Sequence, residues 1–365
     1  MLTRVYADNF RCLVNFELHL GRKQLVFGRN GGGKSSFLDF VLLLRNLAVV
    51  GDFETSIYAH RTRWLSQDEQ IGELEAELDG VRYIYRVVIE PAEAPLRQKL
   101  RTDSLSADGK FLFTFERGTV SLYTDEFKLK VSYPAEPQRS AFAAVPRQPE
   151  NKKLSRFKDW ITLLVGFRIN PFAMEHIADE EDRGPRGSLT NFAAWYRYLV
   201  QADPLANSQF ISTLKDTLDG FAQLRFDSYG EKGKLLVADF SGREQFSLLF
   251  RQLSDGQRCL IGLYAIVHFL VAKGYTVLID EPDNFISIRE VQPWLMTLSE
   301  FLDDGKGQAI LVSHHPEILN SWAAEYGLNF VREDAGPVRV KRFAPSSSTM
   351  LTPAELVARG WENGE

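Results

Sequence analysis

Apolar and polar residues alternate over residues 2–20, as they do in half-buried strands, and residues 24–28 form a short apolar run that ends in glycine. Residues 34–50 follow with apolar side chains on nearly every face of a helix, which is typical of a fully buried helix. The pattern therefore predicts a strand, a glycine-rich turn and a buried helix in that order.

Residues 71–90 contain two alternating runs separated by Asp79-Gly80, the strongest short signal for a β-hairpin. Alternation continues to about residue 131, with a second turn at Asp108-Gly109, so an antiparallel meander is predicted here. Residues 134–155 are then rich in Pro, Gln, Arg and Lys, which indicates a loop or a boundary between lobes.

The rest of the chain mixes helix and strand patterns. Apolar residues recur at helix spacing over 154–165 and 189–224, and residues 223–240 return to strand alternation. The last third is predicted to alternate between helix (255–272), strand (275–280), helix (287–303), strand (308–315) and a short helix from Pro316. Apolar strands alternating with helices predict a parallel sheet covered by helices. The sequence has no internal repeat and no sustained heptads.

Length and charge narrow the function classes. A chain of 365 residues suits about two domains, and its net charge of −5 excludes a globally basic nucleic-acid-binding surface. A DNA contact would need a local basic patch, for which the candidates are Lys152, Lys153, Arg156, Lys158, Arg339, Lys341 and Arg342. The alternative interpretation is ordinary solvated charge. Two cysteines supply no disulfide framework or zinc site and fit a reducing cytoplasm, and no apolar stretch reaches membrane-span length.

Residues 28–35 read G-x-x-x-x-G-K-S and lie between a predicted strand and a predicted helix, where a phosphate-binding loop belongs. Glycines allow backbone N–H groups to wrap a phosphate chain, and the helix N-terminus adds positive potential. Lys34 is expected to reach the outer phosphates and the Ser35 hydroxyl to bind Mg²⁺. The residues predicted to contact ATP are Arg29, Asn30, Gly31, Gly32, Gly33, Lys34, Ser35 and Ser36. The alternative is a glycine-rich turn without a ligand.

Asp280 and Glu281 end an apolar strand, which places both carboxylates at the edge where α/β sheets bind ligands. Asp280 is expected to hold Mg²⁺ together with Ser35, and Glu281 to polarise the attacking water. The alternative is an acidic cap of the following helix.

Two further motifs are weaker when taken alone. Residues 254–257 lie at the N-terminus of the predicted helix at about 255–272, where ordinary helix capping is the alternative. The second apolar strand ends in Ser313, His314 and His315, and His314 can hydrogen-bond a γ-phosphate. A surface histidine pair is the alternative, and metal binding is least favoured because no cysteine cluster or spaced histidine lies nearby.

These four motifs, in this order, resemble the head of an ABC-type ATPase, and more narrowly the RecF, SMC and OLD-type branch. The resemblance covers residue 1 to about residue 320. It implies an α/β P-loop NTPase fold of the ABC-ATPase head type, with a mixed sheet, an antiparallel β subdomain and an inserted helical lobe. The expected domains are a nucleotide-binding lobe (1–135 with 270–345), a largely helical lobe that carries the signature motif (136–269) and a C-terminal tail (346–365).

The resemblance also implies roles for individual residues. Lys34 and Ser35 match the P-loop lysine and magnesium-binding serine, and Asp280, Glu281 and His314 match the magnesium-shell aspartate, catalytic glutamate and switch histidine. The residues that match the signature motif, which contacts ATP bound by a second subunit, are Ser254, Asp255, Gly256 and Gln257. The implied active form is a head-to-tail homodimer with ATP and Mg²⁺ at two composite sites.

Several positions depart from the family pattern. Asp255 replaces the second glycine of the transporter signature, which leans away from a transporter subunit. Residues 282–287 lack the usual histidine or aspartate, and Gln67, Gln138 and Gln148 are equally poor matches for the glutamine of the lobe-connecting loop. The chain has no heptads for coiled-coil arms, and the residues after His315 are too few and too poor in acids for a nuclease domain.

The expected function is that of a cytoplasmic ATPase without a membrane partner, which dimerises on ATP and acts on double-stranded DNA or on a separately encoded effector such as a nuclease or toxin. DNA repair and anti-phage defence are the expected settings. The alternatives are the ATPase subunit of an ABC transporter and a nucleotide-regulated scaffold with negligible turnover.

Overall fold

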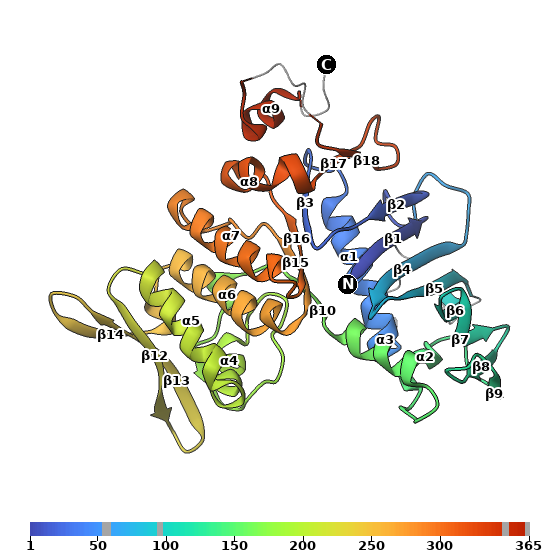
Figure 1. Ribbon diagram of the computed structural model, residues 1–365, viewed down its shortest axis with the longest axis horizontal. Helices are drawn as coiled ribbons and strands as arrows, with labels where there is room; N and C mark the ends of the chain where they lie inside the picture. Colours follow the sequence, from blue (N-terminus) through green and yellow to red (C-terminus); the bar gives the residue numbers. More distant parts are fainter. Residues whose placement is uncertain (53–59, 93–97, 345–349, 362–365) are drawn as a thin grey trace. The chain divides into compact units, whose positions relative to one another are not determined.

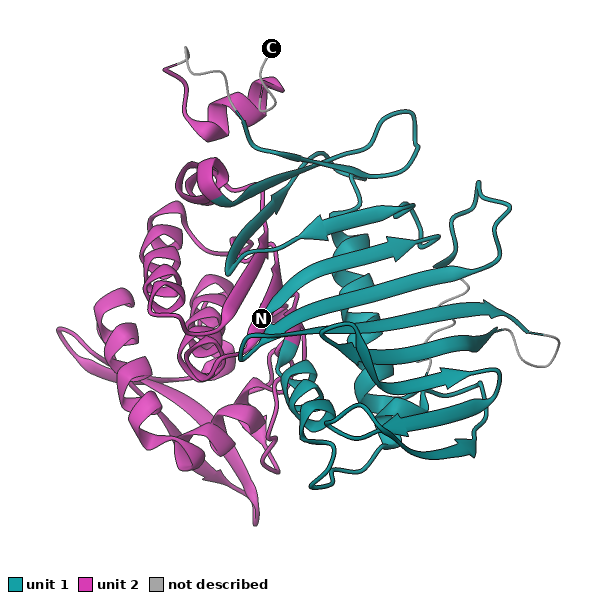
Figure 2. Ribbon diagram, turned by 45° about the vertical axis from the view of Figure 1, so that its right-hand side comes forward, with its two compact units in different colours: residues 1–164, 326–344 teal, residues 165–325, 345–365 magenta. Residues whose placement is uncertain are grey.

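The computed structural model describes residues 1–52, 60–92, 98–344 and 350–361. The chain divides into two compact units, which Figure 2 shows in different colours. Unit 1 comprises residues 1–164 and 326–344, and unit 2 comprises residues 165–325 and 345–365. These units are defined by compactness, whereas the lobes expected from the sequence are defined by nucleotide binding. The expected lobe boundaries therefore stay a prediction.

Unit 1 is built around an antiparallel sheet of eight strands in the order β2-β1-β4-β5-β6-β7-β8-β9. The strands are β1 (Leu2–Asp8), β2 (Phe16–His19), β4 (Gln70–Leu78), β5 (Val81–Pro91), β6 (Gln98–Ala107), β7 (Lys110–Glu116), β8 (Thr119–Tyr123) and β9 (Leu129–Pro134). The predicted hairpins are confirmed, since Asp79-Gly80 joins β4 to β5 and Asp108-Gly109 joins β6 to β7. All four turn residues have positive φ, as a tight hairpin turn requires.

Helices α1 (Lys34–Val50), α2 (Ala141–Ala144) and α3 (Lys152–Thr162) pack with this sheet (Figure 1). The predicted buried helix at 34–50 is confirmed as α1. It lies so close to β4 that a Cβ at Gly72 would come within 3.0 Å of the side chains of Phe40 and Leu44. Gly72 therefore lets α1 approach the strand.

Unit 1 contains a second set of strands, one of which, β3 (Lys23–Phe27), leads through a loop into α1. Strand β3 runs parallel to β17 (Gly327–Val331), and β17 pairs antiparallel with β18 (Arg339–Arg342). Residues from opposite ends of the chain thus form one structural element of this unit.

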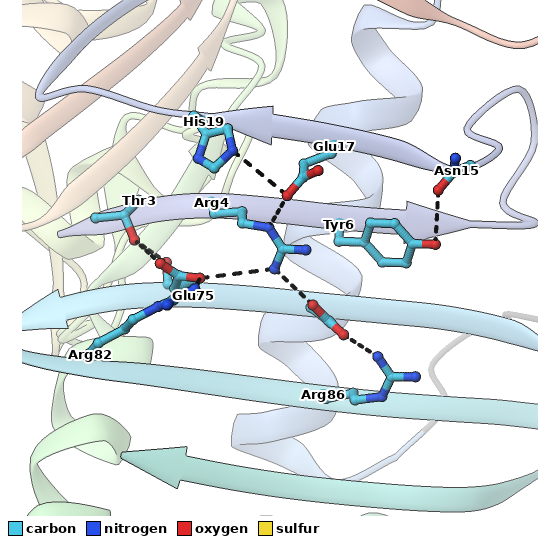
Figure 3. Close-up of polar contacts among 10 residues, drawn as sticks. Thr3, Arg4, Tyr6, Asn15, Glu17, His19, Glu75, Arg82 and Arg86 are labelled. Carbon is cyan, nitrogen blue, oxygen red and sulfur yellow. Dashed lines mark hydrogen bonds and ion pairs between the residues drawn. The ribbon is translucent and has the colours of Figure 1, made fainter. Parts of the chain in front are cut away.

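The outward face of the antiparallel sheet carries a network of opposite charges. Arg4 forms ion pairs with Glu17 and Glu73 (Figure 3). Arg86 pairs with Glu73, and Arg82 pairs with Glu75. Three arginines face three glutamates, so the charges within this network balance.

Three of the four basic candidates in α3 are also engaged within unit 1, while Lys152 is exposed. Arg156 pairs with Asp79, and Lys153 donates to the carbonyl oxygen of Asp125. The Lys158 ammonium donates to three carbonyl oxygens, those of Phe142, Ala143 and Val145. Burial lowers the pKa of Lys158. These contacts favour a structural role for the three side chains.

Unit 2 combines helices with two sets of strands. Its helices are α4 (Phe192–Ala202), α5 (Pro204–Thr217), α6 (Asp255–Phe269), α7 (Ile288–Asp303), α8 (Pro316–Tyr326, whose last residue belongs to unit 1) and α9 (Pro353–Arg359). The predicted helical stretch at 189–224 extends too far, because α5 ends at Thr217 and alternating side chains begin a strand at Phe221. No helix among the described residues is long and apolar enough to cross a membrane.

The strands of unit 2 include a parallel pair and a small antiparallel sheet. Strands β15 (Thr276–Asp280) and β16 (Gln308–Val312) pair in parallel, and every residue of both is buried, as their apolar pattern predicts. The antiparallel sheet consists of β11 (Ile177–Ala178), β12 (Phe221–Tyr229), β13 (Gly233–Ser241) and β14 (Gln245–Leu249), while β10 (Leu164–Phe167) lies at the junction of the two units in sequence.

Asp103 is a fully buried carboxyl group on β6. Burial raises its pKa from 3.8 to about 7, and the Ser140 hydroxyl, which hydrogen-bonds to it, opposes this rise. The carboxyl group of an unfolded chain ionises near its ordinary pKa of about 3.9, whereas the folded one keeps its proton up to about pH 7. Asp103 therefore makes the free energy of unfolding fall as the pH rises across this interval.

We expect Asp103→Asn to remove this dependence, since asparagine has a similar shape and no titrating proton. The free energy of unfolding of the variant relative to the wild type should then increase between pH 5 and pH 8. Urea denaturation of both proteins at the two pH values measures the difference, and all other titrating groups cancel. A difference that stays constant with pH would show that Asp103 ionises in its ordinary range.

Candidate nucleotide-binding site

The loop at residues 28–33 joins β3 to α1 in unit 1, so the predicted order of strand, turn and helix is confirmed. The N-cap of α1 is Gly33, which adopts a φ of 95° and has no side chain to bond the first turn. Because the first N–H groups of a helix lack helical partners, this end of α1 presents donors and positive potential. Such an end suits an anion.

Close packing explains why two of the loop residues are glycines. A Cβ at Gly28 would lie 2.4 Å from the carbonyl oxygen of Phe330 in β17, and one at Gly33 would lie 2.5 Å from Val338 Cγ2. Both residues also have positive φ. A larger residue at either position would displace the loop from β17 or from the segment before β18.

The Lys34 ammonium is enclosed by the loop. Its Nζ donates to the carbonyl oxygens of Gly28 (2.7 Å) and Arg29 (3.1 Å), and only 8% of the residue is exposed. Arg29, Asn30, Gly31 and Ser35 are exposed, and Ser36 is half-buried. A buried cation beside carbonyl oxygens of the loop, next to a helix N-terminus and exposed loop residues, is an arrangement that can bind a polyphosphate.

Asp280 ends β15 in unit 2, and its carboxylate is held by a residue that sequence reasoning missed. Arg168 donates from Nε (2.9 Å) and Nη2 to Asp280 Oδ2. The Asp280 side chain is 10% exposed and the Arg168 side chain is 65% exposed. Arg168 follows β10, and its sequence neighbourhood carries no motif that points to Asp280. The three glutamine candidates, Gln67, Gln138 and Gln148, belong to unit 1, where Gln67 donates to Asp8 and Gln148 accepts from Lys130.

The donor chemistry of the predicted Mg²⁺ ligands fits the ion. The Asp280 carboxylate and the Ser35 hydroxyl are hard oxygen ligands, the kind that Mg²⁺ prefers. Asp280 already has a cationic partner in Arg168, as a nearly buried carboxylate requires. Within the described residues no group of three or more His, Cys, Asp or Glu forms a metal site, so a zinc-type centre has no support there.

Glu281 follows β15 in a tight turn and has a φ of 49°. Its backbone N–H donates to the carbonyl oxygen of Val312 in β16, and its exposed carboxylate accepts from Asn284 Nδ2 at 2.7 Å. The alternative of an acidic helix cap is wrong, because α7 is capped by Ser287 in a capping box with Glu290. The Glu281 carboxylate is therefore left for another role.

The two histidines after β16 differ. His315 Nδ1 accepts from the backbone N–H of Glu317 in the first turn of α8, whereas His314 is exposed one residue earlier. The Ser313 hydroxyl donates to Asp283 Oδ1 at 2.6 Å and thereby links the loops that follow β16 and β15. The loop that contains His314 is therefore tied to the loop that contains Glu281.

The predicted signature residues lie at the start of α6. Ser254 and Gln257 form a capping box, so the capping interpretation is confirmed for these two residues. Asp255 pairs with Arg258, whose guanidinium also donates to the carbonyl oxygen of Pro171. Capping does not exclude ligand binding, since Ser254 is exposed, and the in-trans role stays a prediction.

Each motif thus has a defined place within its own unit. Unit 1 contains the predicted phosphate-binding loop, and unit 2 contains Asp280, Glu281, His314 and the predicted signature residues. Sequence reasoning missed Arg168 and Asn284. Asn284 had a weak signal, because it follows Glu281 by three positions in a turn-forming sequence.

Comparisons with known proteins agree with this arrangement. Among solved structures, the chain is similar to the SMC head domain from Thermotoga maritima, with a TM-score of 0.50 and 13% sequence identity over 94% of this chain and 99% of that chain. This likeness shows a mixed α/β fold of the SMC-head P-loop ATPase type. No curated protein matches the chain. A family model matches residues 25–320, and the chain belongs to that family, described as "AAA domain, putative AbiEii toxin, Type IV TA system".

Proposed function

We propose that the protein hydrolyses ATP in a Mg²⁺-dependent reaction as an ATP-sandwiched homodimer of the RecF- or OLD-like branch, and that it controls a separate effector protein. The observation that carries the ATPase assignment is the loop at residues 28–35, in which the buried Lys34 ammonium lies beside loop carbonyl oxygens at the N-terminus of α1. Membership of an AAA-domain family agrees with it.

In this proposal the phosphates of ATP bind to Lys34 and to the backbone N–H groups of residues 29–36. Asp280 and Ser35 would hold Mg²⁺, which neutralises phosphate charge when bound. Glu281 polarises the attacking water, and His314 hydrogen-bonds the γ-phosphate. Residues 254–257 contact the nucleotide of a second copy of the chain. Positioning and charge neutralisation supply most of the rate in such a reaction.

Four of the seven basic candidates are engaged within unit 1, while Lys152, Lys341 and Arg342 are exposed. This majority favours a protein effector over DNA. Lys153, Arg156 and Lys158 are bound within unit 1, and the Arg339 guanidinium donates to the carbonyl oxygens of Val14 and Val338. The charges within the network in Figure 3 balance. The words "putative AbiEii toxin, Type IV TA system" in the family description support defence rather than repair as the setting.

The proposal is tested by steady-state ATP hydrolysis with and without double-stranded DNA, at low and at physiological salt. We expect turnover that requires Mg²⁺ and does not change with DNA at either salt concentration. Stimulation by DNA that weakens steeply with salt would overturn the choice of partner, because phosphate contacts release counterions. Nucleotide binding without turnover would overturn the enzymatic assignment and favour a nucleotide-regulated scaffold.

A further inference from the structure

The loop after Glu281 contains a side chain to which the proposed mechanism assigns no task. We propose that Asn284 is a positioning residue, which holds the carboxylate of Glu281 in the orientation that hydrolysis needs. The inference rests on the proposed function, because it assigns Asn284 a task in the same reaction. Its basis is the hydrogen bond of 2.7 Å from Asn284 Nδ2 to Glu281 Oε2.

An exposed glutamate needs such a partner if it is to act on one water molecule. Its side chain rotates about three bonds, and holding it in one rotamer costs conformational entropy. The Asn284 backbone N–H also donates to the Glu281 carbonyl oxygen (3.2 Å), so main chain and side chain close the same turn. The turn therefore restricts the Glu281 carboxylate before any substrate binds.

The chemistry of the amide suits this task. A neutral donor orients a carboxylate without forming an ion pair with it, whereas an arginine or lysine would favour the charged form more strongly and weaken it as a base. The neighbouring Asp280 shows the contrast, since its carboxylate is bound by the Arg168 guanidinium. Two adjacent carboxylates thus have different partners, which fits one metal ligand and one residue that acts on water.

Asn284 is itself held in place from two sides. The backbone carbonyl oxygen of Asn284 accepts a hydrogen bond from Cys259 Sγ (3.5 Å) in α6. Burial raises the pKa of Cys259 to about 12, so the thiol keeps the proton that it donates. The next carbonyl, that of Phe285, would lie 2.7 Å from a Cβ at Gly256. On the other side, Asp283 accepts from Ser313 after β16. These contacts anchor the backbone of the turn on both sides of Asn284, so its side-chain amide starts from a fixed position beside the Glu281 carboxylate.

The test compares Asn284→Asp with Asn284→Ala. Aspartate keeps the size of the side chain and the backbone contact with Cys259, but it replaces the donor with a second carboxylate. A positioning role through the amide donor predicts that kcat falls about 10- to 100-fold in both variants, and at least as far in Asn284→Asp. KM for ATP should stay within about twofold, and the affinity for a fluorescent ATP analogue should not change.

Asn320→Asp is the matched control, because it adds the same charge to an exposed position of α8 and should leave kcat unchanged. If Asn284→Asp turns over ATP like the wild type while Asn284→Ala does not, the side chain is only a structural spacer and the inference is wrong. If both variants match the wild type, Glu281 needs no partner and the inference is also wrong. A wild type that does not hydrolyse ATP above the level of Lys34→Ala removes the proposed function itself, and the inference with it.

Discussion

Lys34→Ala is expected to reduce ATP turnover by about 100-fold or more and to weaken nucleotide binding strongly. The Lys34 ammonium is the buried charge inside the loop at 28–33, and its partners include two carbonyl oxygens of the loop. A polyphosphate offers this cation charged acceptors in place of neutral ones, and removing a preorganised charge of this kind costs about two to three orders of magnitude in rate. Phosphate release and titration with a fluorescent ATP analogue measure the two effects.

Two further variants make this result interpretable. Lys128→Ala is the control, since Lys128 forms an exposed ion pair with Glu126 in the same unit, and such pairs contribute little. Lys34→Met retains most of the buried aliphatic stem and loses only the charge, so it separates loss of binding from loss of folding. Thermal denaturation of each variant checks the fold. Nucleotide affinity of wild-type strength in Lys34→Met would contradict phosphate binding by this residue.

Glu281→Gln is expected to lower turnover about 10²- to 10⁴-fold, the contribution typical of a general base, while ATP still binds. Glutamine keeps the shape of the side chain and its capacity to accept from Asn284, so the loop should persist. Slow hydrolysis then lets the ATP-bound form accumulate. The molecular mass measured by light scattering after size exclusion should shift from monomer to dimer on addition of ATP and Mg²⁺.

Glu300→Gln is the control for this experiment, because it removes the same charge from an exposed position of α7. It should retain wild-type turnover. Rapid hydrolysis by Glu281→Gln would remove Glu281 from its assigned role. ATP-bound Glu281→Gln that stays monomeric would leave the hydrolytic assignment intact and contradict the sandwiched dimer.

Arg168 shows where sequence reasoning stops. It lies 112 residues before Asp280 in the chain, and no local pattern connects the two. Asn284 is only three positions from Glu281, yet its contact depends on the left-handed backbone of Glu281 and on the anchoring by Cys259 and Ser313. The same limit applies to the basic residues near α3, whose pairing with Asp79 and with carbonyl oxygens is invisible in their composition.

The sequence by itself determined the local elements and the identity of the motifs. Strand alternation, hairpin glycines and the all-round apolar helix at 34–50 depend on neighbouring residues, so their physical causes are contained in short windows. Only the tertiary structure decided which polar groups meet, because those contacts join segments that are distant in sequence. It showed that Arg168 pairs with Asp280 and that Ser287, not Glu281, caps α7. It also showed that Lys153, Arg156 and Lys158 are bound within unit 1. The reason is that buried or partly buried charge must be paired, and the fold rather than the sequence pattern selects the partner.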